Sequence, residues 1–432
     1  MIVYISTFVI ALCISLWLTW KNNKSNDTHL PEHVWFQRKY LIVYVCAYFA
    51  DWLQGPYVYA LYESYGFSED DIARLFVAGF ATSGIVGPFV GTLADKCGRK
   101  NMCLAYFIIY IMSVFTKPFV RYDILMAGRV LGGIGTSILC TTFESWMVSE
   151  HKRRDYPQEL LDDTFAKSSF YNSMTAIVAG VSAQLVANEF GYVAPFAIAT
   201  IPLIAGILLT FLLWEWDVST KTSSKSSILD SFRILDTNLI VLGLSQALFS
   251  GAMYVFVFLW TPALDGGSTS APYGLIFSIF MVMISIGTNI FKRYANYVIY
   301  LPYWIMGGAA ISCVITSVFI TQEYVVFASF AFFECICGIM FPTYGTLRSE
   351  YIPEEHRTTI MNIYRVPLNA YVTGILVLKK HMSIVEAFTG CFITYLAALM
   401  IWNQFKPNKN IIDNKEYKKT QDNEEDFGEL DA

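Results

Sequence analysis

The sequence predicts an all-α membrane protein that crosses the bilayer many times. The chain has 432 residues, of which 55% are hydrophobic and only 15% are charged, whereas about one quarter of a soluble domain is charged. Apolar runs of about 20 residues, the length of a transmembrane helix, recur along nearly the whole chain. Strands of a membrane barrel would alternate polar and apolar residues, and a run such as 198–213 shows no alternation.

Residues 2–20 form the first apolar run, and the basic residues Lys21 and Lys24 follow it. A cleaved signal peptide has the opposite order, with positive charge before the apolar run. We therefore expect residues 1–39 to form an uncleaved anchor helix, with its N-terminus outside, and a cytoplasmic linker.

Twelve further apolar spans divide six and six around a hydrophilic segment at 215–236 that is rich in Ser, Thr and Lys. We expect a N-terminal six-helix half at 40–214, a cytoplasmic loop at 215–236 and a C-terminal six-helix half at 237–405. The polar tail at 406–432 is expected to be disordered and cytoplasmic. The expected spans are residues 40–62, 72–93, 101–119, 122–148, 165–187, 193–214, 237–262, 271–291, 298–319, 322–347, 357–380 and 384–405.

Most of the 30 lysines and arginines fall on one side of these spans. Basic loops face the cytoplasm, so this side is expected to be inside. Four basic residues are expected in outer loops instead, namely Lys117, Arg121, Lys379 and Lys380.

The turn at 91–100, between the second and third of the twelve spans, combines glycines with four charged residues. Glycine supplies the positive φ angle that a tight turn needs, and Asp95 can accept from the free N–H groups of a neighbouring helix end. We expect an inner gate in which Arg99 pairs with Glu144 and Asp95 caps a helix of the other half. The expected gate residues are Gly91, Asp95, Gly98, Arg99, Lys100 and Glu144.

Charged side chains deep within the spans are costly in a bilayer and usually functional. The acidic candidates are Asp51 and Glu334, and the basic candidates are Arg129 and Arg365, one from each half. The alternative for each is a pair with another buried charge that only fixes helix packing.

The segment 51–56 is typical of a helix that lines a cavity. Asp51, Gln54 and Gly55 lie at positions i, i+3 and i+4, so they share one helix face. Pro56 breaks the backbone hydrogen bonds and can bend the helix. An ordinary proline kink beside a satisfied aspartate is the alternative.

Several motifs in these regions resemble those of a known superfamily. Residues 91–100 (Gly-x-x-x-Asp-Lys-Cys-Gly-Arg-Lys) look like the signature loop of the major facilitator superfamily, and residues 129–135 (Arg-x-x-x-Gly-x-Gly) are similar to its fourth-helix motif. The counterpart of the signature loop in the second half, at 288–297, keeps its two basic residues and lacks the Gly-x-x-x-Asp pattern. Within the superfamily, five segments resemble the eukaryotic molybdate-anion transporter family, namely 51–57, 128–133, 143–146, 256–262 and 365–368.

The resemblance implies two six-helix halves, a site near the bilayer midplane and alternating access. It also implies uptake of molybdate, a tetrahedral dianion, across the plasma membrane. Guanidinium groups chelate oxyanions, so we expect Arg129 and Arg365 to close around one anion. Further hydrogen bonds to the anion are expected from Gln54, Gln246, Asn172 and Asn362.

Uptake of a dianion against an inside-negative potential needs a coupled cation or a steep gradient. Asp51 and Glu334 are the expected proton carriers, because a buried carboxyl group can hold a proton near neutral pH. Rival interpretations are a carrier of sulfate, another small anion or an organic solute, and a membrane sensor or scaffold that transports nothing.

Enzyme chemistry is not expected, because the sequence has no nucleophile–base spacing and no cluster of metal ligands. The nine cysteines include no CxxC pair and are interpreted as small core residues. We expect no metal and no cofactor. The expected partners are the lipid bilayer and a small oxyanion, without nucleic acid, and the protein is expected to be monomeric.

Overall fold

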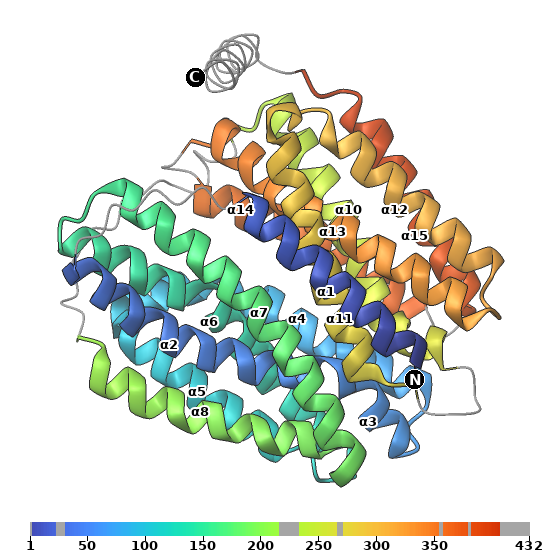
Figure 1. The fold of residues 1–432 in the computed structure, drawn as a ribbon, viewed down its shortest axis with the longest axis horizontal. Coiled ribbons are helices and arrows are strands. Elements are labelled where there is room, and N and C mark those ends of the chain that lie inside the picture. Colours follow the sequence, from blue (N-terminus) through green and yellow to red (C-terminus); the bar gives the residue numbers. More distant parts are fainter. Residues whose placement is uncertain are drawn as a thin grey trace.

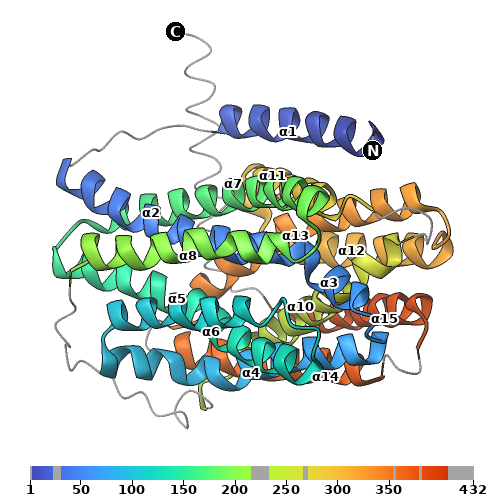
Figure 2. The same cartoon turned by 90° about the horizontal axis from the view of Figure 1, so that it is seen from below.

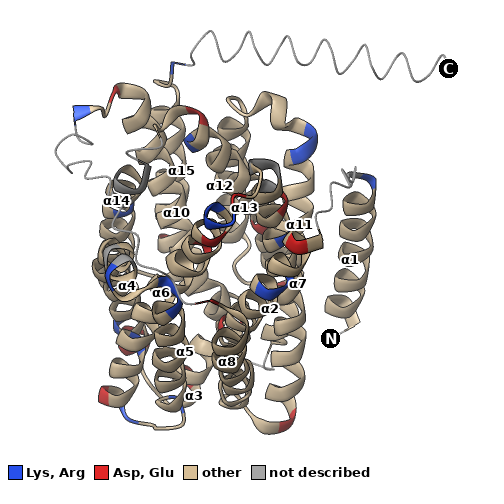
Figure 3. Ribbon diagram, turned by 90° about the vertical axis from the view of Figure 1, so that its left-hand side faces the viewer, with Lys and Arg blue, Asp and Glu red and all other residues tan. Residues whose placement is uncertain are grey.

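The computed structural model describes residues 2–22, 31–215, 233–265, 271–353, 357–378 and 382–406. These residues form two six-helix halves and one additional N-terminal helix, as the sequence predicts (Figure 1). Ten of the described helices are long and apolar enough to cross a membrane, and Figure 3 shows how few charged positions the helix ribbons carry. The chain is therefore a helical, multi-pass membrane protein.

The first span of the N-terminal half is interrupted. The helix α2 (Pro31–Gln54) passes through the 3-10 turn η1 (Gly55–Tyr57) into the short helix α3 (Val58–Ser64). The interruption lies at Pro56, where a backbone donor is missing, so the predicted bend is confirmed. The remaining helices of this half are α4 (Glu69–Cys97), α5 (Arg99–Phe115), α6 (Tyr122–Arg153), α7 (Gln158–Phe190) and α8 (Ala194–Leu213).

The C-terminal half begins at Thr237, where the side chain of Asp236 accepts a hydrogen bond from the backbone N–H of Leu239 at 2.7 Å and caps the first helix. Its helices are α10 (Thr237–Leu264), α11 (Tyr273–Tyr294), the 3-10 turn η2 (Ala295–Tyr297), α12 (Leu301–Val318), α13 (Glu323–Tyr351), α14 (Arg357–Leu378) and α15 (Ile384–Trp402). We name the end of the bundle where α4 begins the outer end and the end where α4 meets α5 the inner end, after the predicted orientation.

The two halves meet along two seams, α7 against α11 and α4 against α14. In the first seam, a Cβ atom on Gly180 would lie 2.7 Å from the carbonyl oxygen of Gly274, so both helices need glycine for their close approach. Near this contact, Gln184 accepts hydrogen bonds from the N–H of Gly274 at 2.9 Å and from the hydroxyl of Tyr57 at 3.0 Å. The outer part of this seam is therefore held by both packing and hydrogen bonds.

The additional helix α1 (Ile2–Asn22) lies outside both halves, along the seam between α7 and α11 (Figure 2). Ser15 donates a hydrogen bond to Ser285 of α11 at 2.9 Å, and Tyr4 donates one to Glu323 at the start of α13. One apolar cluster joins side chains of α1, α7 and α11. The helix is thus anchored on the C-terminal half while it covers the seam.

The helix α2 begins at Pro31, whereas the sequence analysis placed residues 31–39 in a linker. Proline is favoured in the first turn of a helix. Gln37 of the second turn is buried and donates hydrogen bonds to Asp163 at 2.9 Å and to Thr164 at 3.0 Å. The extra turns are helical because they pack against the inner end of α7, which a hydropathy pattern does not reveal.

The turn between α4 and α5 consists of one residue, Gly98, whose φ is +90°. The predicted need for glycine is confirmed at this position, since other residues rarely adopt this angle. The turn predicted at 91–100 was too long, because the apolar pattern ends at the membrane boundary whereas the helices continue beyond it.

Packing of α11 on α13 predicts a stability effect. A Cβ atom on Gly338 would lie 2.1 Å from the carbonyl oxygen of Ile284, which is backbone and cannot move aside. Gly338→Ala is expected to destabilise the protein by about 1–3 kcal/mol through overpacking, seen as a lower melting temperature in detergent. Gly345→Ala on the same helix is the control, because its Cβ would meet no atom within 4 Å. Equal melting temperatures for the two variants would contradict the close helix contact.

Candidate functional site

A cavity of about 290 Å³ lies between the two halves. Its walls come from α2, η1, α3, α4, α5 and α6 of the N-terminal half and from α10 of the C-terminal half. Glycines make the room, since a Cβ on Gly79 would lie 2.9 Å from the guanidinium of Arg129, and one on Gly133 would lie 2.5 Å from the carbonyl oxygen of Gly79. Among the described residues, three charged ones line this space, namely Asp51, Lys117 and Arg129.

Arg129 of α6 is half-buried in the cavity wall. Its Nε donates a hydrogen bond to the carbonyl oxygen of Leu75 at 3.1 Å, and its guanidinium carbon lies 4.7 Å from the ring centre of Phe76. An arginine carries five N–H donors, and the other four have no acceptor among the described residues. These donors are available to a ligand in the cavity.

Asp51 of α2 accepts a hydrogen bond from the hydroxyl of Tyr110 and interacts electrostatically with Arg129. It forms no ion pair with a described residue. The site therefore holds a carboxylate next to a guanidinium without joining the two, so each remains able to interact with a ligand or a proton.

The backbone of Lys117 lies in the turn after α5 at the outer end, as expected, but its side chain does not face the outer solution. Its side chain is only 2% exposed and lines the cavity. The ammonium donates a hydrogen bond to the hydroxyl of Tyr62 at 2.8 Å and lies 5.7 Å from the ring centre of Phe196. Lys117 follows the last residue of α5 by two positions, and its long side chain turns back into the bundle instead of reaching the lipid headgroups.

Arg365 of α14 does not line the cavity. It faces α4 across the second seam, where a Cβ on Gly87 would lie 3.2 Å from its Nη1. Arg129 faces Gly79 of the same helix, eight residues earlier, so the two arginines lie about 12 Å apart along α4 at 1.5 Å per residue. The two arginines do not surround one common space in this structure.

The four amide residues expected in the site have different surroundings. Gln54 lines the cavity, and Asn172 of α7 accepts a hydrogen bond from the indole of the lining residue Trp52 at 2.9 Å. Gln246 of α10 has a buried carbonyl oxygen without a hydrogen-bond partner among the described residues. The side chain of Asn362 lies outside the described residues.

Toward the inner end, one face of α6 continues from the cavity wall. Thr136 lines the cavity, and Cys140 and Glu144 follow it at intervals of four residues, so the three share a face. Cys140 and Glu144 are both exposed. Because Asp51 and Arg365 both act electrostatically on Cys140, this thiol lies in an opening between the halves rather than against lipid.

The expected ion pair between Arg99 and Glu144 is not formed. Arg99 donates to Ser149, five residues beyond Glu144 on α6, and Glu144 forms no ion pair with a described residue. Five residues rotate a helix by about 140° beyond a full turn, so the two positions face different directions. Gly91 is exposed, and the side chain of Asp95 lies outside the described residues.

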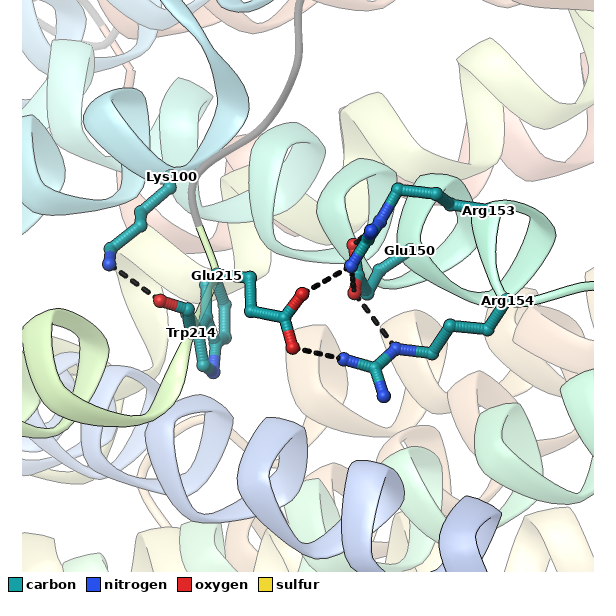
Figure 4. A network of polar contacts seen from close by, with 6 residues as sticks. All are labelled: Lys100, Glu150, Arg153, Arg154, Trp214 and Glu215. Carbon is teal, nitrogen blue, oxygen red and sulfur yellow. Dashed lines mark hydrogen bonds and ion pairs between the residues drawn. The ribbon is translucent and has the colours of Figure 1, made fainter.

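Lys100 lies inside the N-terminal half (Figure 4). Its ammonium is buried and donates a hydrogen bond to the carbonyl oxygen of Trp214 at 2.6 Å, where a cation stabilises the end of α8. Beside it, Arg154 contacts both Glu150 and Glu215 at 2.8 Å. These contacts fasten α5, α6 and the end of α8 to one another within one half.

Glu334 of α13 is buried in the C-terminal half and does not line the cavity. It forms neither a hydrogen bond nor an ion pair with a described residue. A buried carboxyl group without a partner is costly in its ionised form.

Sequence reasoning missed Lys117, Tyr110 and the wall formed by Tyr254 and Trp260 of α10. A lysine at the end of a span normally reaches the headgroups, so its position alone gives no signal. Aromatic residues are common at both membrane interfaces, so the type of these residues gives no signal either. The segment 256–262 did stand out, but only through its family resemblance.

Comparison with known proteins identifies relatives along almost the whole chain. A family model of the major facilitator superfamily, described as sugar transporters with 12 transmembrane segments, matches residues 1–339. A molybdate-anion transporter of Takifugu rubripes is 33% identical over 446 residues, covering 91% of this chain and 92% of its own length. One of Xenopus tropicalis is 33% identical over 420 residues, with the same shares of the two chains covered.

Among solved structures, the fold is similar to two transporters. A mutant of the nucleoside transporter NupG has a TM-score of 0.70 at 9% identity, covering 86% of this chain and 98% of that chain. The POT family transporter PepTSo has a TM-score of 0.68 at 11% identity, covering 90% of this chain and 99% of that chain. At these identities the similarity concerns the fold alone.

The opening at the inner end predicts the reactivity of one thiol. In a variant with Cys13 and Cys97 replaced by serine, a membrane-impermeant maleimide is expected to label Cys140 from the inner side, because this side chain is exposed to the opening. Cys103 is buried in the core and serves as the internal control. Mass spectrometry of the labelled protein identifies the site. Labelling that persists after Cys140→Ala would show that the opening lies elsewhere.

Proposed function

We propose, since the chain belongs to the molybdate-anion transporter family of the major facilitator superfamily, that it carries molybdate across a membrane by alternating access. The observation that carries this proposal is the cavity between the halves, where four N–H donors of Arg129 are available to a ligand. Guanidinium donors suit a tetrahedral oxyanion in geometry and charge.

The contacts between the halves support an alternating-access cycle. At the outer end, rings from both halves meet, with Phe258 lying 5.6 Å from Tyr59 and 5.2 Å from Phe76 between ring centres. At the inner end, Cys140 and Glu144 are exposed in an opening. This combination corresponds to the state that is closed outside and open inside.

A ligand in the cavity touches both halves, which is what couples its binding to their movement. The C-terminal wall is formed by α10, whose Tyr254 lies 5.1 Å from Phe80 between ring centres. The N-terminal wall contains Arg129. An anion that binds between these walls stabilises the state in which both are within reach. Arg365 lies further toward the inner end, where it meets an anion that leaves through the opening.

The energetics favour coupling to protons. Moving a dianion inward against an inside-negative potential costs about 4.6 kcal/mol per 100 mV, twice the cost for a single charge. Asp51, which lies in the cavity wall beside Arg129, and Glu334, which is buried without a partner, are the carboxyl groups suited to carry the protons.

The proposal includes a location and an orientation. The protein acts as a monomeric carrier in the plasma membrane and not as an enzyme, with its N-terminus outside and its C-terminus in the cytoplasm. The direction of α1 agrees with this orientation: Tyr4 contacts the start of α13, at the end of the bundle where α4 also begins, and Thr19 accepts from Asn289 near the other end of α11 at 3.1 Å.

Molybdenum accumulation in cells tests the proposed function. Wild-type protein is expected to raise accumulation, and Arg129→Ala at the same surface level is expected to reduce it at least tenfold, because a hydrogen bond to a charged group is lost. Arg129→Lys keeps the charge and is expected to retain part of the uptake. Arg365→Ala tests the second arginine, with reduced uptake expected if the anion passes it.

Sulfate is the competitor in this assay, because it is also a tetrahedral dianion. Little inhibition by sulfate supports molybdate as the substrate, and strong inhibition favours a sulfate carrier. No accumulation above background in the wild type would contradict transport of molybdate.

Proton coupling has its own test in proteoliposomes. At a clamped membrane potential, an inward proton gradient is expected to drive molybdate accumulation by the wild type. Asp51→Asn is expected to abolish this accumulation while molybdate exchange continues, because the carrier can still reorient with its anion. Glu334→Gln receives the same assay. Wild-type accumulation that is insensitive to the proton gradient would contradict the coupling.

A further inference from the structure

We infer that Lys117 supplies a second anion-binding charge to the cavity and is the residue that makes the site prefer dianions over monoanions. The inference rests on the proposed function and deepens it, because it names a residue that selects the charge class of the anion. It concerns a residue that neither the sequence motifs nor the family resemblance singled out.

The surroundings of Lys117 leave its charge without compensation. The side chain is 2% exposed, its ammonium donates to the hydroxyl of Tyr62 at 2.8 Å, and the rings of Tyr62 and Phe196 lie at 5.3 and 5.7 Å. Among the described residues no carboxylate forms an ion pair with it. An ammonium buried in this way is costly, and a purely structural position would be filled at lower cost by an apolar residue of similar length.

A second cation lies within electrostatic range. Arg129 lines the same cavity, and the two positive charges act on each other. Like charges repel more strongly in a low-dielectric interior than in water, so the cavity without a ligand keeps two cations at an energetic cost. Asp51, the one carboxylate that the described residues contribute to the lining, interacts with Arg129 and is hydrogen-bonded to Tyr110. With Asp51 ionised, the lining has one positive charge in excess.

An oxyanion in the cavity relieves this repulsion. The interaction between a fixed charge and a ligand scales with the charge of the ligand. A dianion therefore gains about twice as much from the Lys117 ammonium as a monoanion of the same shape gains. Lys117 thus contributes to affinity for both classes and contributes to the preference between them.

The position of Lys117 also fits the path of the anion. Lys117 comes just after α5 at the outer end, whereas Arg129 lies seven residues inside the outer start of α6, which is about 10 Å along the helix. The ammonium therefore meets an anion that enters from the outer side, before or together with the guanidinium. In this respect it differs from Arg365, which lies on the inner side of the cavity.

Equilibrium binding of two isosteric anions tests the inference. The purified full-length protein is titrated with molybdate, a dianion, and with perrhenate, a tetrahedral monoanion, while the intrinsic tryptophan fluorescence is followed, to which the lining residues Trp52 and Trp260 contribute. Lys117→Met is expected to raise the Kd for molybdate about tenfold or more. The Kd for perrhenate is expected to rise by only about threefold, the square root of that factor. The reason is that a monoanion loses half as much interaction energy with Lys117 as a dianion loses. Lys117→Arg is expected to stay close to the wild type.

Arg121→Gln is the matched control. Arg121 also carries a positive charge at the outer end, but its side chain is 68% exposed and is paired with Asp123 at 2.6 Å. Its removal is expected to leave both Kd values unchanged. If Arg121→Gln raised the two Kd values as much as Lys117→Met does, the effect would come from the general surface charge, and the inference would be overturned.

The remaining outcomes separate the two proposals. A wild type that binds neither anion overturns the proposed function and the inference together. The inference alone is overturned if the wild type binds molybdate and Lys117→Met leaves the Kd for molybdate unchanged. It is also overturned if Lys117→Met raises the Kd values for both anions by the same factor. Lys117→Gln is a second neutral variant, which keeps a donor for Tyr62. Failure of both neutral variants to fold would show that the ammonium is needed for folding, and this result would also overturn the inference.

Discussion

The need to keep a guanidinium away from lipid organises the centre of this protein. Arg129 sits within a transmembrane helix, where exposure to acyl chains would be prohibitive. Its Nε is bound to the carbonyl of Leu75 and its plane lies over Phe76, both on α4. The approach of α4 is possible because Gly79 and Gly133 have no side chains. The same small residues that admit the arginine leave the space that becomes the cavity.

The cavity is asymmetric, since its three charges all come from the N-terminal half and α10 provides the remaining wall. The N-terminal half is also fastened internally at its inner end, where Lys100 binds the end of α8 and Arg154 joins Glu150 to Glu215. The three charged residues of the lining and these fastening contacts therefore belong to the same half. The seams between the two halves rely on glycine contacts and few polar bonds, which permits rocking.

The helix order, the division into two halves, the bend at Pro56 and the glycine turn at Gly98 could all be predicted from the sequence. Each of them follows from local rules: apolar length, a missing donor, and a positive φ. The site could be predicted only in part. Arg129 and Asp51 stand out because charge within a span is rare, whereas Lys117 at a span end is indistinguishable from a lysine that reaches the headgroups. The positions of Arg129 and Arg365 along the axis of the bundle, and the partner of Arg99, depend on how neighbouring helices are rotated and shifted relative to one another. These relations between helices are not encoded locally in a single sequence.

The position of α1 makes the two seams unequal toward the surrounding lipid. Along α7 and α11, acyl chains meet α1, whose Ile10 and Trp20 are strongly exposed, and not the junction itself. Along α4 and α14, the exposed side chains of Ile85, Phe89 and Val366 belong to the moving halves. Annular lipids must therefore rearrange at one flank while a protein strip shields the other. Lateral pressure and bilayer thickness consequently affect the movement of the two halves mainly at the α4–α14 seam.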